Sequence, residues 1–539
     1  MARKASKTQA LAIIRMCREG NDSRALKMPT HYKWGILLVL LTVCLRLPAI
    51  VHPKAIDDEA GYAAVAHELL HGGTLYVSAL DRRPPLLFWI YTAIFLVVGP
   101  YNWLPFHLIA VAWMLLSMWG LYALGRELFS REVGLAAALL YSIYTASVYY
   151  VLLEFNGEVM MDLPIVWALY IAFKQHTSRH RPELVLSGVL LCCAFLIKQP
   201  AAIAALPVGM YLLLPTYRAQ RHLSLRHSVL HATLLTTSYF LTLGIVALVL
   251  YHQGILGEAY YWTIGDHDIP HGPTDPIFWQ FGIGMTLAFA VAWHPLVFLS
   301  VLAVREGCHR GARYWELLKA EYTALLVLLG CSFIGVSASG RFSPHYFLQL
   351  LPALVLLAAP VLMAIWTKTR TYRFCMLQPR TLNVVLFITA AAFLISNTVS
   401  LWLQRPENEL SQYVREHSTP EDKVFFWGEL VDDLYAEAQR RPASRYIHFY
   451  PLTGYIFGSP LRYDPHYDTT YRILPGAWDI LQTEFQQSPP LFFVDFDPGT
   501  IAKKYPPSRY PFLRQLLAQD YEMVLSTPKG VVYRRIDRR

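Results

Sequence analysis

The sequence contains few charged residues. Only 16% of its 539 residues are Asp, Glu, Lys or Arg, whereas 55% are hydrophobic and 14% are aromatic. Soluble globular proteins carry about 25% charged residues, so this composition excludes an ordinary soluble protein and indicates a chain embedded in a membrane. The formal net charge of +9 is compatible with nucleic acid or an anionic lipid surface as a partner. The placement of the charges along the chain decides between these two classes.

Cysteine is scarce and irregularly spaced. The seven cysteines lie mostly in apolar stretches, at positions Cys17, Cys44, Cys192, Cys193, Cys308, Cys331 and Cys375. Without a CxxC pair or metal-ligand spacing, they imply neither a disulfide framework nor a zinc site. The sequence also lacks an internal repeat and a heptad array, which argues against a solenoid or a coiled coil. No small-residue cleavage site follows the basic segment 1–33, so we expect a retained anchor rather than a removed signal peptide.

Long apolar runs occupy much of the chain. A helix needs about 20 apolar residues to cross the roughly 30 Å of hydrocarbon in a bilayer. Eleven stretches approach this length: 34–50, 104–124, 134–152, 159–173, 184–197, 201–215, 229–251, 280–303, 321–338, 346–366 and 381–403. A further run at 86–99 is short and begins after Pro84 and Pro85. Counting it as a full crossing would invert the orientation of every later span.

The charges of the loops set the orientation. If 86–99 does not cross and the N-terminus is cytoplasmic, the inside segments hold 24 Lys and Arg against 8 Asp and Glu, and the rest of the chain holds 23 against 30. This bias follows the positive-inside rule. We therefore expect eleven transmembrane helices in the plasma (inner) membrane, with an interfacial or half-inserted helix at 86–99. The positive net charge then reports orientation, and no nucleic acid partner is implied.

The C-terminal part of the chain differs from the rest. Hydropathy falls after Leu403, and short β-rich runs such as KVFFWG and LFFVDF alternate with helical stretches such as PENELSQYVREH and PFLRQLLAQDYEMVL. This pattern predicts a small soluble α/β domain. We expect a cytoplasmic segment 1–33, an all-α polytopic membrane domain 34–403 with an outer loop 51–103, and a periplasmic or extracellular domain 405–539.

The first outer loop holds three consecutive acids, Asp57, Asp58 and Glu59. Ionised carboxylates at the mouth of a membrane span are costly, which favours a functional site. The alternative is an N-terminal cap of a helix at 60–70, where acidic residues interact favourably with the helix dipole.

A second acidic cluster follows in the second outer loop, with Glu154, Asn156, Glu158 and Asp162. Glu158 and Asp162 are four residues apart and would share one helix face. Two acidic clusters on one side of the membrane, together with the basic pair Arg82 and Arg83, indicate a site for a polar substrate and a phosphate. The alternative is that the acids cap helices and pair with the arginines.

Other polar residues lie at outer ends of later spans: Lys198, Arg341, His345 and Tyr346. A single cation there can extend to lipid headgroups without a functional role, but their shared side supports one site. The outer loop 252–278 has no Lys or Arg and holds His252, Glu258, Asp266, His267, Asp268, His271 and Asp275. A metal site is one reading of this loop, although its spacing matches no standard ligand set.

The motifs of the outer loops resemble those of the C-type (GT-C) membrane glycosyltransferases. The pattern Asp58-Glu59-x-x-Tyr62, followed by Arg83-Pro84-Pro85-Leu86, is similar to the D-E-x-x-Y and K-P-P-L motifs of the protein mannosyltransferase and aminoarabinose transferase group. The segments GLYALGRELFSREVGLAAALLYS, NGEVMMDLPIVWALY, FLIKQPAA and HYFLQLLPALVLLAA resemble the bacterial branch of that group. The resemblance covers roughly residues 30–400.

Such enzymes transfer a sugar, with inversion, from a polyprenyl-phosphate carrier to a lipid, glycan or protein acceptor at the outer membrane face. The resemblance implies catalytic roles for Asp58, Glu59 and Glu158. It implies binding roles for Asp57, Tyr62, Arg82, Arg83, Asn156, Lys198, Arg341, His345 and Tyr346. Arg83 stands where relatives have lysine, and it offers phosphate a bidentate fork. No cofactor is certain, and a divalent metal, if one is needed, would be held by Asp58 and Glu158.

Two other functions remain as alternatives. An oligosaccharide-transferring ligase would have a similar architecture. A lipid or sugar transporter would also be polytopic, but transporters usually show repeated halves and broken helices at mid-bilayer, whereas the acids here concentrate at the outer ends of spans. A receptor or scaffold would not need eleven spans as an anchor. The C-terminal domain is expected to contribute to acceptor choice, and the products would belong to cell-envelope glycans, lipopolysaccharide or glycosylated proteins.

Overall fold

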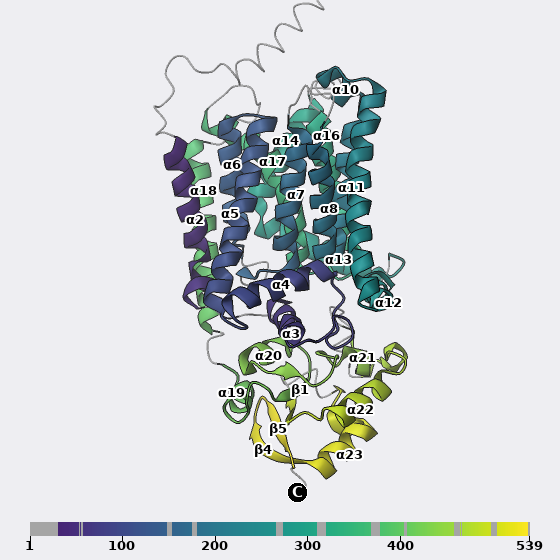
Figure 1. The fold of residues 1–539 in the computed structure, drawn as a ribbon. Helices are drawn as coiled ribbons and strands as arrows, with labels where there is room; N and C mark the ends of the chain where they lie inside the picture. Colours follow the sequence, from purple (N-terminus) through teal and green to yellow (C-terminus); the bar gives the residue numbers. More distant parts are fainter. Residues whose placement is uncertain are drawn as a thin grey trace, which may run out of the picture.

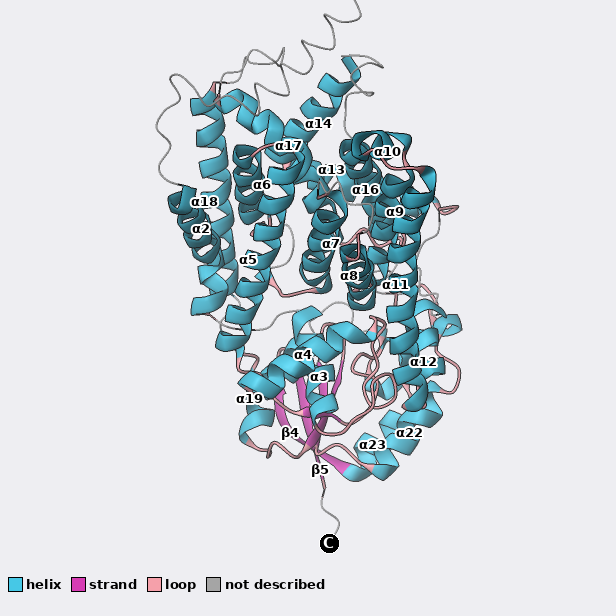
Figure 2. Cartoon of the chain, turned by 45° about the horizontal axis from the view of Figure 1, so that its top comes forward, coloured by secondary structure: helices cyan, strands magenta, loops and turns pink. Residues whose placement is uncertain are grey.

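The protein forms a bundle of helices with a small α/β domain at one end (Figure 1). The computed structural model describes residues 31–52, 54, 58–147, 153–174, 181–265, 273–309, 320–367, 378–403, 407–456, 464, 466–496 and 504–536. Within these residues, strands are confined to the C-terminal domain (Figure 2). The described part of the chain is therefore a helical bundle with one mixed sheet attached to it.

Each of the eleven apolar stretches contains a helix. The bundle consists of α2 (His31–Val51), α5 (Trp103–Leu128), α6 (Arg131–Tyr144), α7 (Gly157–Phe173), α8 (Glu183–Ile197), α9 (Ala205–Leu213), α11 (Leu225–His252), α13 (Pro276–Ala292), α14 (His294–His309), α16 (Ala320–Ser337), α17 (Leu351–Trp366) and α18 (Pro379–Leu403). Shorter elements connect them: η2 (Gln199–Ala204), α10 (Pro215–Arg221), α12 (Leu256–Tyr260), η3 (Tyr261–Gly265) and η4 (Pro344–Leu350).

The number of membrane crossings is only partly established. Among the described residues, five helices are long and apolar enough to cross a membrane, or six if the bent pair α13 and α14 counts as one span. Further helices, including α8, α9 and α16, are apolar but shorter. The helices thus indicate a multi-pass membrane protein, while eleven crossings and their orientation stay predictions.

The stretch 280–303 is not one straight helix as the sequence predicts. It is split between α13 and α14, whose axes differ by 96°. Pro295 explains the break, because it has no backbone N–H with which to continue α13 but is tolerated in the first turn of a new helix. The new helix begins with a hydrogen bond from the Val297 N–H to the Trp293 carbonyl (3.0 Å).

The first outer loop contains two helices, α3 (Asp58–Leu70) and α4 (Pro85–Val98). Pro84 and Pro85 start α4, because proline is favoured in the first turn, and Gly99 ends it with φ of 87°. Figure 1 shows α4 lying across the end of the bundle, between the bundle and the C-terminal domain. The helix predicted at 86–99 is therefore present, and its depth in a bilayer stays a prediction.

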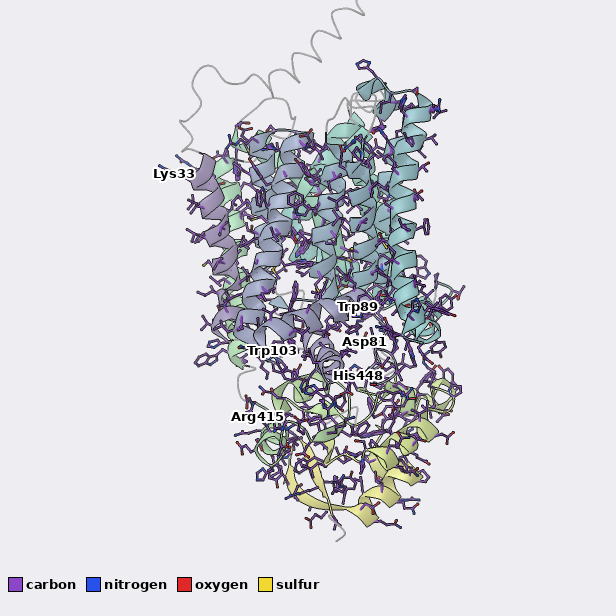
Figure 3. The ribbon with its side chains drawn as sticks, viewed as in Figure 1. Lys33, Asp81, Trp89, Trp103, Arg415 and His448 are labelled. Carbon is purple, nitrogen blue, oxygen red and sulfur yellow. The ribbon has the colours of Figure 1, made fainter. Side chains whose placement is uncertain are left out.

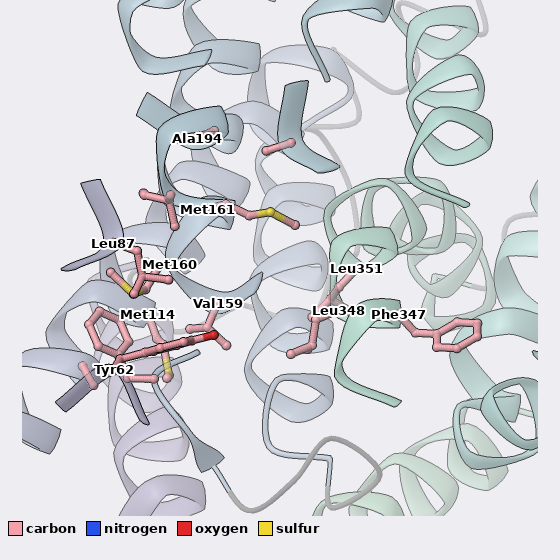
Figure 4. Packing of buried hydrophobic residues seen from close by; sticks show 14 of the residues in the cluster. Tyr62, Leu87, Met114, Val159, Met160, Met161, Ala194, Phe347, Leu348 and Leu351 are labelled. Atoms are coloured by element: carbon pink, nitrogen blue, oxygen red, sulfur yellow. The ribbon is translucent and has the colours of Figure 1, made fainter. Parts of the chain in front are cut away.

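Apolar side chains fill the interior beside the first outer loop. Figure 4 shows Tyr62 of α3 together with Leu87, Met114 and Met160 from three other helices. All four side chains are buried. Burial of this kind stabilises a fold in proportion to the apolar area removed from solvent, and here it fixes α3 against the bundle.

The C-terminal domain contains a five-stranded sheet with the order β2-β1-β3-β5-β4. Its strands are β1 (Lys423–Trp427), β2 (Arg441–Pro442), β3 (Phe492–Phe496), β4 (Tyr521–Thr527) and β5 (Gly530–Arg535). The first three pair in parallel, and β5 pairs antiparallel with β3 and β4. The helical elements of the domain are α19 (Glu409–Glu416), α20 (Asp432–Ala438), α21 (Tyr450–Thr453), η6 (Thr470–Arg472), α22 (Ala477–Gln487), η8 (Pro507–Arg509) and α23 (Pro511–Asp520).

The predicted elements of this domain are confirmed with one correction. KVFFWG and LFFVDF form the central strands β1 and β3, and the stretch PENELSQYVREH contains α19. The stretch PFLRQLLAQDYEMVL, however, is helical only to Asp520, and its last five residues belong to β4. The reason is tertiary, because Tyr521 and Met523 pair with β5, which a helix could not do.

Close helix packing predicts a contrast between two glycines. A Cβ atom added at Gly134 of α6 would come within 2.5 Å of the Tyr122 carbonyl oxygen of α5, whereas one added at Gly209 of α9 would meet nothing within 4 Å. We expect Gly134→Ala to lower the melting temperature of the detergent-solubilised protein by forcing α5 and α6 apart. The control Gly209→Ala should leave it unchanged or raise it slightly, since alanine favours helices. Equal melting temperatures for the two variants would contradict this packing.

Candidate active site

Polar side chains from several elements meet at the end of the bundle that faces the C-terminal domain. Asp58 is the first residue of α3, and Arg83 lies just before α4. Glu158 is in the first turn of α7, Lys198 caps the end of α8, and His345 lies in η4. The fold thus brings together residues that are separated by up to 287 positions in the chain.

A chain of ion pairs forms the centre of this site. Arg83 Nη2 is 2.5 Å from Asp58 Oδ1, and Arg83 Nη1 is 3.0 Å from Asp81 Oδ2. The Tyr62 hydroxyl donates to Asp58 Oδ2 at 3.0 Å, and the Tyr62 ring lies 4.9 Å from the guanidinium carbon of Arg83. A guanidinium held at both ends in this way has a fixed position and orientation.

The backbone around Arg83 is held as tightly as its side chain. The Arg83 N–H donates to Asp81 Oδ1 at 2.9 Å, and the Arg83 carbonyl accepts from the Tyr76 hydroxyl at 2.9 Å. Tyr76 is fully buried and adopts φ of 65°, an uncommon conformation for a residue other than glycine. Such strain persists only where the surrounding structure imposes it, and here it accompanies the bond that positions Arg83.

The surrounding charges keep Asp58 ionised. Burial alone would raise the pKa of the Asp58 carboxyl, but the positive charge of Arg83, with smaller effects from His345 and Lys198 and the Tyr62 hydrogen bond, holds this pKa well below its usual value. The two carboxylates correspondingly hold the pKa of Arg83 well above its usual value against the opposite effect of burial. The pair is therefore charged throughout the physiological pH range.

A second ion pair lies beside the first. Lys198 Nζ contacts Glu158 Oε1, and Lys198 Nζ is 4.9 Å from the ring centre of Tyr346. His345, the neighbour of Tyr346, places its Nε2 3.6 Å from Asp58 Oδ2 and so connects the two pairs. Glu158 Oε2 is buried and has no hydrogen-bond partner among the residues that the structure describes.

Two more arginines add positive charge to the site. Burial and the charges of Arg82 and Arg83 lower the pKa of Arg341, which shows that the three guanidinium groups lie close together. The backbone at Arg82 is fixed by Gln199, whose Nε2 donates to the Arg82 carbonyl at 2.5 Å. Like charges are assembled in this way where an anion is bound.

Glu59 and Asn156 are not part of this cluster. Both oxygens of Glu59 face away from Asp58: Oε2 is 3.1 Å from His107 Nε2, and Oε1 accepts from the Phe155 N–H at 3.1 Å. The Asn156 side chain accepts from the Val159 N–H at 3.1 Å and caps α7. The structure therefore places these two predicted site residues in the packing that ties the two outer loops together.

An apolar pocket lies next to the charged cluster, among η2, α7, α16 and α17. Its lining includes Met161, Ile165, Pro200, Ala204, Leu328 and Pro352. Pro200 follows directly after Lys198 and Gln199 in the chain, and Gln349, which also lines the pocket, belongs to the same short helix as His345. The segments that carry Lys198 and His345 thus also contribute to the lining of this pocket.

Known proteins share this architecture. A sequence model of the family described as dolichyl-phosphate-mannose-protein mannosyltransferase matches residues 82–247. The structure of ArnT from Cupriavidus metallidurans bound to undecaprenyl phosphate superposes with a TM-score of 0.60, at 14% identity, over 94% of this chain and 99% of ArnT. The resemblance to the C-type membrane glycosyltransferases is confirmed.

Two further structures agree with this result. ArnT from the same organism in the apo state gives a TM-score of 0.57 at 14% identity, over 94% of this chain and 98% of ArnT. The oligosaccharyltransferase AglB from Archaeoglobus fulgidus, in complex with an inhibitory peptide and a dolichol-phosphate, gives 0.53 at 12% identity, over 94% of this chain and 74% of AglB. No curated protein sequence matches the chain. At these identities the structural likeness shows the C-type glycosyltransferase fold.

Several predicted residues lie elsewhere or outside the described part of this fold. Asp57, Asp266, His267, Asp268 and His271 are outside the described residues. Asp162 accepts from the Tyr141 hydroxyl at 3.2 Å and Glu258 from Trp262 Nε1 at 3.2 Å, while Asp275 caps α13. His252 is the last residue of α11.

The described residues contain no group of three or more His, Cys, Asp or Glu side chains that could hold a metal ion. Asp58 and Glu158, the two residues expected to hold a divalent metal if one is needed, are each paired with a cationic side chain. Their negative charge is thus already compensated by the protein.

Three residues of the site were not predicted from the sequence. Asp81 directly precedes the basic pair in the printed sequence, so the run D-R-R-P-P contained a signal that was overlooked. Gln199 follows Lys198, and only its contact with Arg82 identifies it. His448 comes from the C-terminal domain, more than 360 positions after Arg83, and nothing in the local sequence connects it with this cluster of side chains.

The Asp58–Arg83 pair predicts how stability depends on pH. Because the pKa of Asp58 is lowered by folding, its contribution to stability is complete above the unfolded value of about 3.9 and is lost as the pH falls below it. The difference in melting temperature between wild type and Asp58→Asn should therefore stay constant from about pH 8 to pH 5 and shrink below about pH 4. The control Asp479→Asn changes an exposed residue of α22 and should follow wild type throughout. A difference that already changes between pH 8 and 6 would contradict a fully ionised Asp58.

Proposed function

We propose that the protein is a membrane glycosyltransferase that transfers a sugar, with inversion, from a polyprenyl-phosphate carrier to an acceptor. The observation that carries this proposal is the ionised Asp58 carboxylate, fixed 2.5 Å from Arg83 inside a cluster of cationic side chains. One arrangement supplies both functions that the reaction needs: a carboxylate for the nucleophile and positive charge for the departing phosphate.

The leaving group explains the excess of positive charge. Four cationic side chains, Arg82, Arg83, Lys198 and Arg341, share the site with Asp58, Asp81 and Glu158. Developing negative charge on a polyprenyl phosphate would be stabilised there by preorganised donors. The ArnT structure contains undecaprenyl phosphate and the AglB structure contains a dolichol-phosphate, which supports a lipid-linked phosphate as the ligand of this fold.

The apolar side chains that line the pocket are of the kind that the first isoprene units of the carrier would contact. Pro200 of the lining lies two positions after Lys198 in the chain, so a phosphate at the cluster would have apolar surface nearby. Sites for amphipathic ligands combine an apolar wall with a few convergent polar groups in this way.

Activation of the acceptor hydroxyl is assigned to Asp58. An ionised carboxylate can orient an acceptor hydroxyl and take its proton while the hydroxyl oxygen bonds to the anomeric carbon. At the same time the bond between the anomeric carbon and the phosphate oxygen breaks, and the polyprenyl phosphate leaves. Glu158, whose second oxygen faces no described hydrogen-bond donor, is the second acid of the site. Glu59 is assigned a positioning role, because its contacts with His107 and Phe155 hold the start of α3.

The location follows from the charge bias of the loops. We infer eleven spans in the plasma (inner) membrane, a cytoplasmic N-terminus, and the active site and C-terminal domain on the periplasmic or extracellular side. The acceptor would then be a lipid, a glycan or a protein of the cell envelope. The likeness to AglB favours an oligosaccharide-transferring ligase as the second candidate. It ranks second because the TM-score of AglB is lower than that of ArnT.

The role of Asp58 predicts loss of transfer on removal of its charge. Asp58→Asn should abolish transfer of sugar from the polyprenyl-phosphate sugar fraction of the source cells to their envelope extract, because the amide cannot take a proton. The loss should reach at least about 10²-fold, the usual size of a general-base effect. The exposed Asp479→Asn should retain full activity. Full activity of a folded Asp58→Asn variant would exclude this mechanism.

The role of Arg83 predicts a selective effect on the donor. Arg83→Ala should raise the half-saturating donor concentration by about tenfold to a hundredfold, the equivalent of one charge-assisted hydrogen bond, with a smaller effect on the acceptor. Arg83→Lys keeps the charge and should recover part of the loss, while Arg514→Ala, an exposed residue of α23, should change nothing. An unchanged donor dependence would show that Arg83 does not bind the phosphate.

A further inference from the structure

The C-terminal domain packs directly against the catalytic loop. A Cβ atom added at Gly61, within one turn of Asp58, would lie 2.6 Å from Asp432 Oδ1, so α20 closely approaches the backbone of α3. The Leu80 N–H donates to the Arg445 carbonyl at 3.0 Å, which ties the domain to the segment preceding Arg83. The domain is thus part of the wall around the site.

His448 extends from this domain toward the ion pairs. Three positions after Arg445, its ring stacks on Tyr450 with 4.8 Å between ring centres and an angle of 2°, and its Nε2 lies 3.4 Å from Asp432 Oδ1. Figure 3 labels His448 and Asp81 near each other at the junction of the bundle and the domain. The charges of Asp81, Arg83, Arg82 and Asp58 all act on His448, so its imidazole lies within electrostatic range of the cluster.

The imidazole of His448 is neutral and has one nitrogen available. Burial, the largest effect, lowers its pKa to about 4, so it carries a single ring proton near neutral pH. Nε2 lies 3.4 Å from Asp432 Oδ1, a contact that does not assign the ring proton to either nitrogen. Nδ1 is buried and has no hydrogen-bond partner in the described part of the chain. A buried polar nitrogen without a partner is costly, and a ligand hydroxyl would satisfy Nδ1 in either tautomer, as donor to a bare nitrogen or as acceptor from an N–H.

The geometry of an inverting displacement places the acceptor on the side of the site that faces the C-terminal domain. A polyprenyl carrier approaches from the bundle, because its hydrocarbon chain requires the apolar pocket or the lipid phase. In an inverting displacement the nucleophile attacks from the face opposite the phosphate. The C-terminal domain lies beyond the end of the bundle, across α3 and α4 from the transmembrane helices (Figure 1). The nucleophile therefore enters between the catalytic loop and the domain.

We propose that Nδ1 of His448 binds a hydroxyl group of the acceptor, a sugar or a lipid alcohol, and that residues 445–450 form the acceptor side of the active site. Asp432 is a positioning residue, since its carboxylate faces the Nε2 edge of the ring at 3.4 Å. This inference rests on the proposed function and adds to it the chemical class of the acceptor and the residue that selects it.

The test uses the full-length protein in detergent. The polyprenyl-phosphate sugar fraction of the source cells serves as donor, and an envelope extract from cells lacking the protein serves as acceptor, each diluted separately. His448→Ala should raise the half-saturating amount of acceptor at least about tenfold, the equivalent of one hydrogen bond, and change the donor dependence less than about twofold. His448→Gln retains a hydrogen-bond acceptor and should be intermediate. His417→Ala is the matched control and should resemble wild type, since His417 is an exposed histidine that follows the last residue of α19 and stacks on Tyr413.

The outcomes separate the two proposals. An active wild type with an unchanged acceptor dependence in His448→Ala overturns this inference and leaves the proposed function intact. The inference is also overturned if His448→Ala alters the donor dependence. It is overturned as well if both His448 variants lose activity together with a lowered melting temperature, because a purely structural role of His448 would produce these results. A folded wild type that transfers no sugar from any component of the donor fraction overturns the proposed function.

Discussion

The Asp58–Arg83–Asp81 chain is the interaction on which the rest of the site depends. Buried ions are expensive to desolvate, and they are tolerated only when each charge is paired in good geometry. Here one guanidinium neutralises two carboxylates, the Tyr62 hydroxyl satisfies one further oxygen of Asp58, and the Asp81 side chain also accepts from the Arg83 backbone. Loss of the Arg83 side chain would leave both carboxylates without their main compensating charge. The chain therefore fixes the position of the carboxylate relative to the other cations.

The surrounding fold supplies the rigidity that this chain requires. α3 is held from three sides: by buried apolar side chains of the bundle, by the contacts of Glu59 with His107 and Phe155, and by α20 of the C-terminal domain. Glycines make the close approaches possible. At Gly157 a Cβ atom would lie 2.9 Å from the Lys198 side chain, so a larger residue would displace the lysine from Glu158. The contacts that stabilise the loop thus also orient the side chains of the ion-pair cluster.

The C-terminal domain also contributes to the surroundings of the ion-pair cluster. Its central strands carry buried residues such as Phe425, Trp427 and Val494, while α20 and β2 contact α3 of the first outer loop. The segment from Arg445 to Tyr450 also reaches this loop, through the hydrogen bond from the Leu80 N–H to the Arg445 carbonyl, and it carries His448. In the role proposed for it, this segment would contact the acceptor and leave the lipid-linked donor to the bundle.

The strength of local signals explains which features the sequence could predict. Apolar runs of span length, prolines that start helices and alternating β-rich runs act through neighbouring residues, so the helices, the strands β1 and β3 and the helix α4 were predicted correctly. Where distant contacts compete, the prediction was wrong. The run YEMVL has an ambiguous local pattern, and pairing with β5 makes it a strand. The break in the stretch 280–303 has a local cause instead: the missing N–H of Pro295, which the sequence prediction did not take into account, accompanies a bend of 96°.

The candidate site shows the same division. The sequence alone determined that this is a membrane-embedded chain, and its motifs indicated Asp58, Tyr62 and Arg83 as site residues, because these depend on composition and on short spacings. Only the tertiary structure decided that Glu59 turns toward His107, that Lys198 pairs with Glu158, and that His448 reaches the site from another domain. The physical reason is that side-chain direction and long-range pairing depend on packing among segments far apart in the chain, about which adjacent residues carry no information.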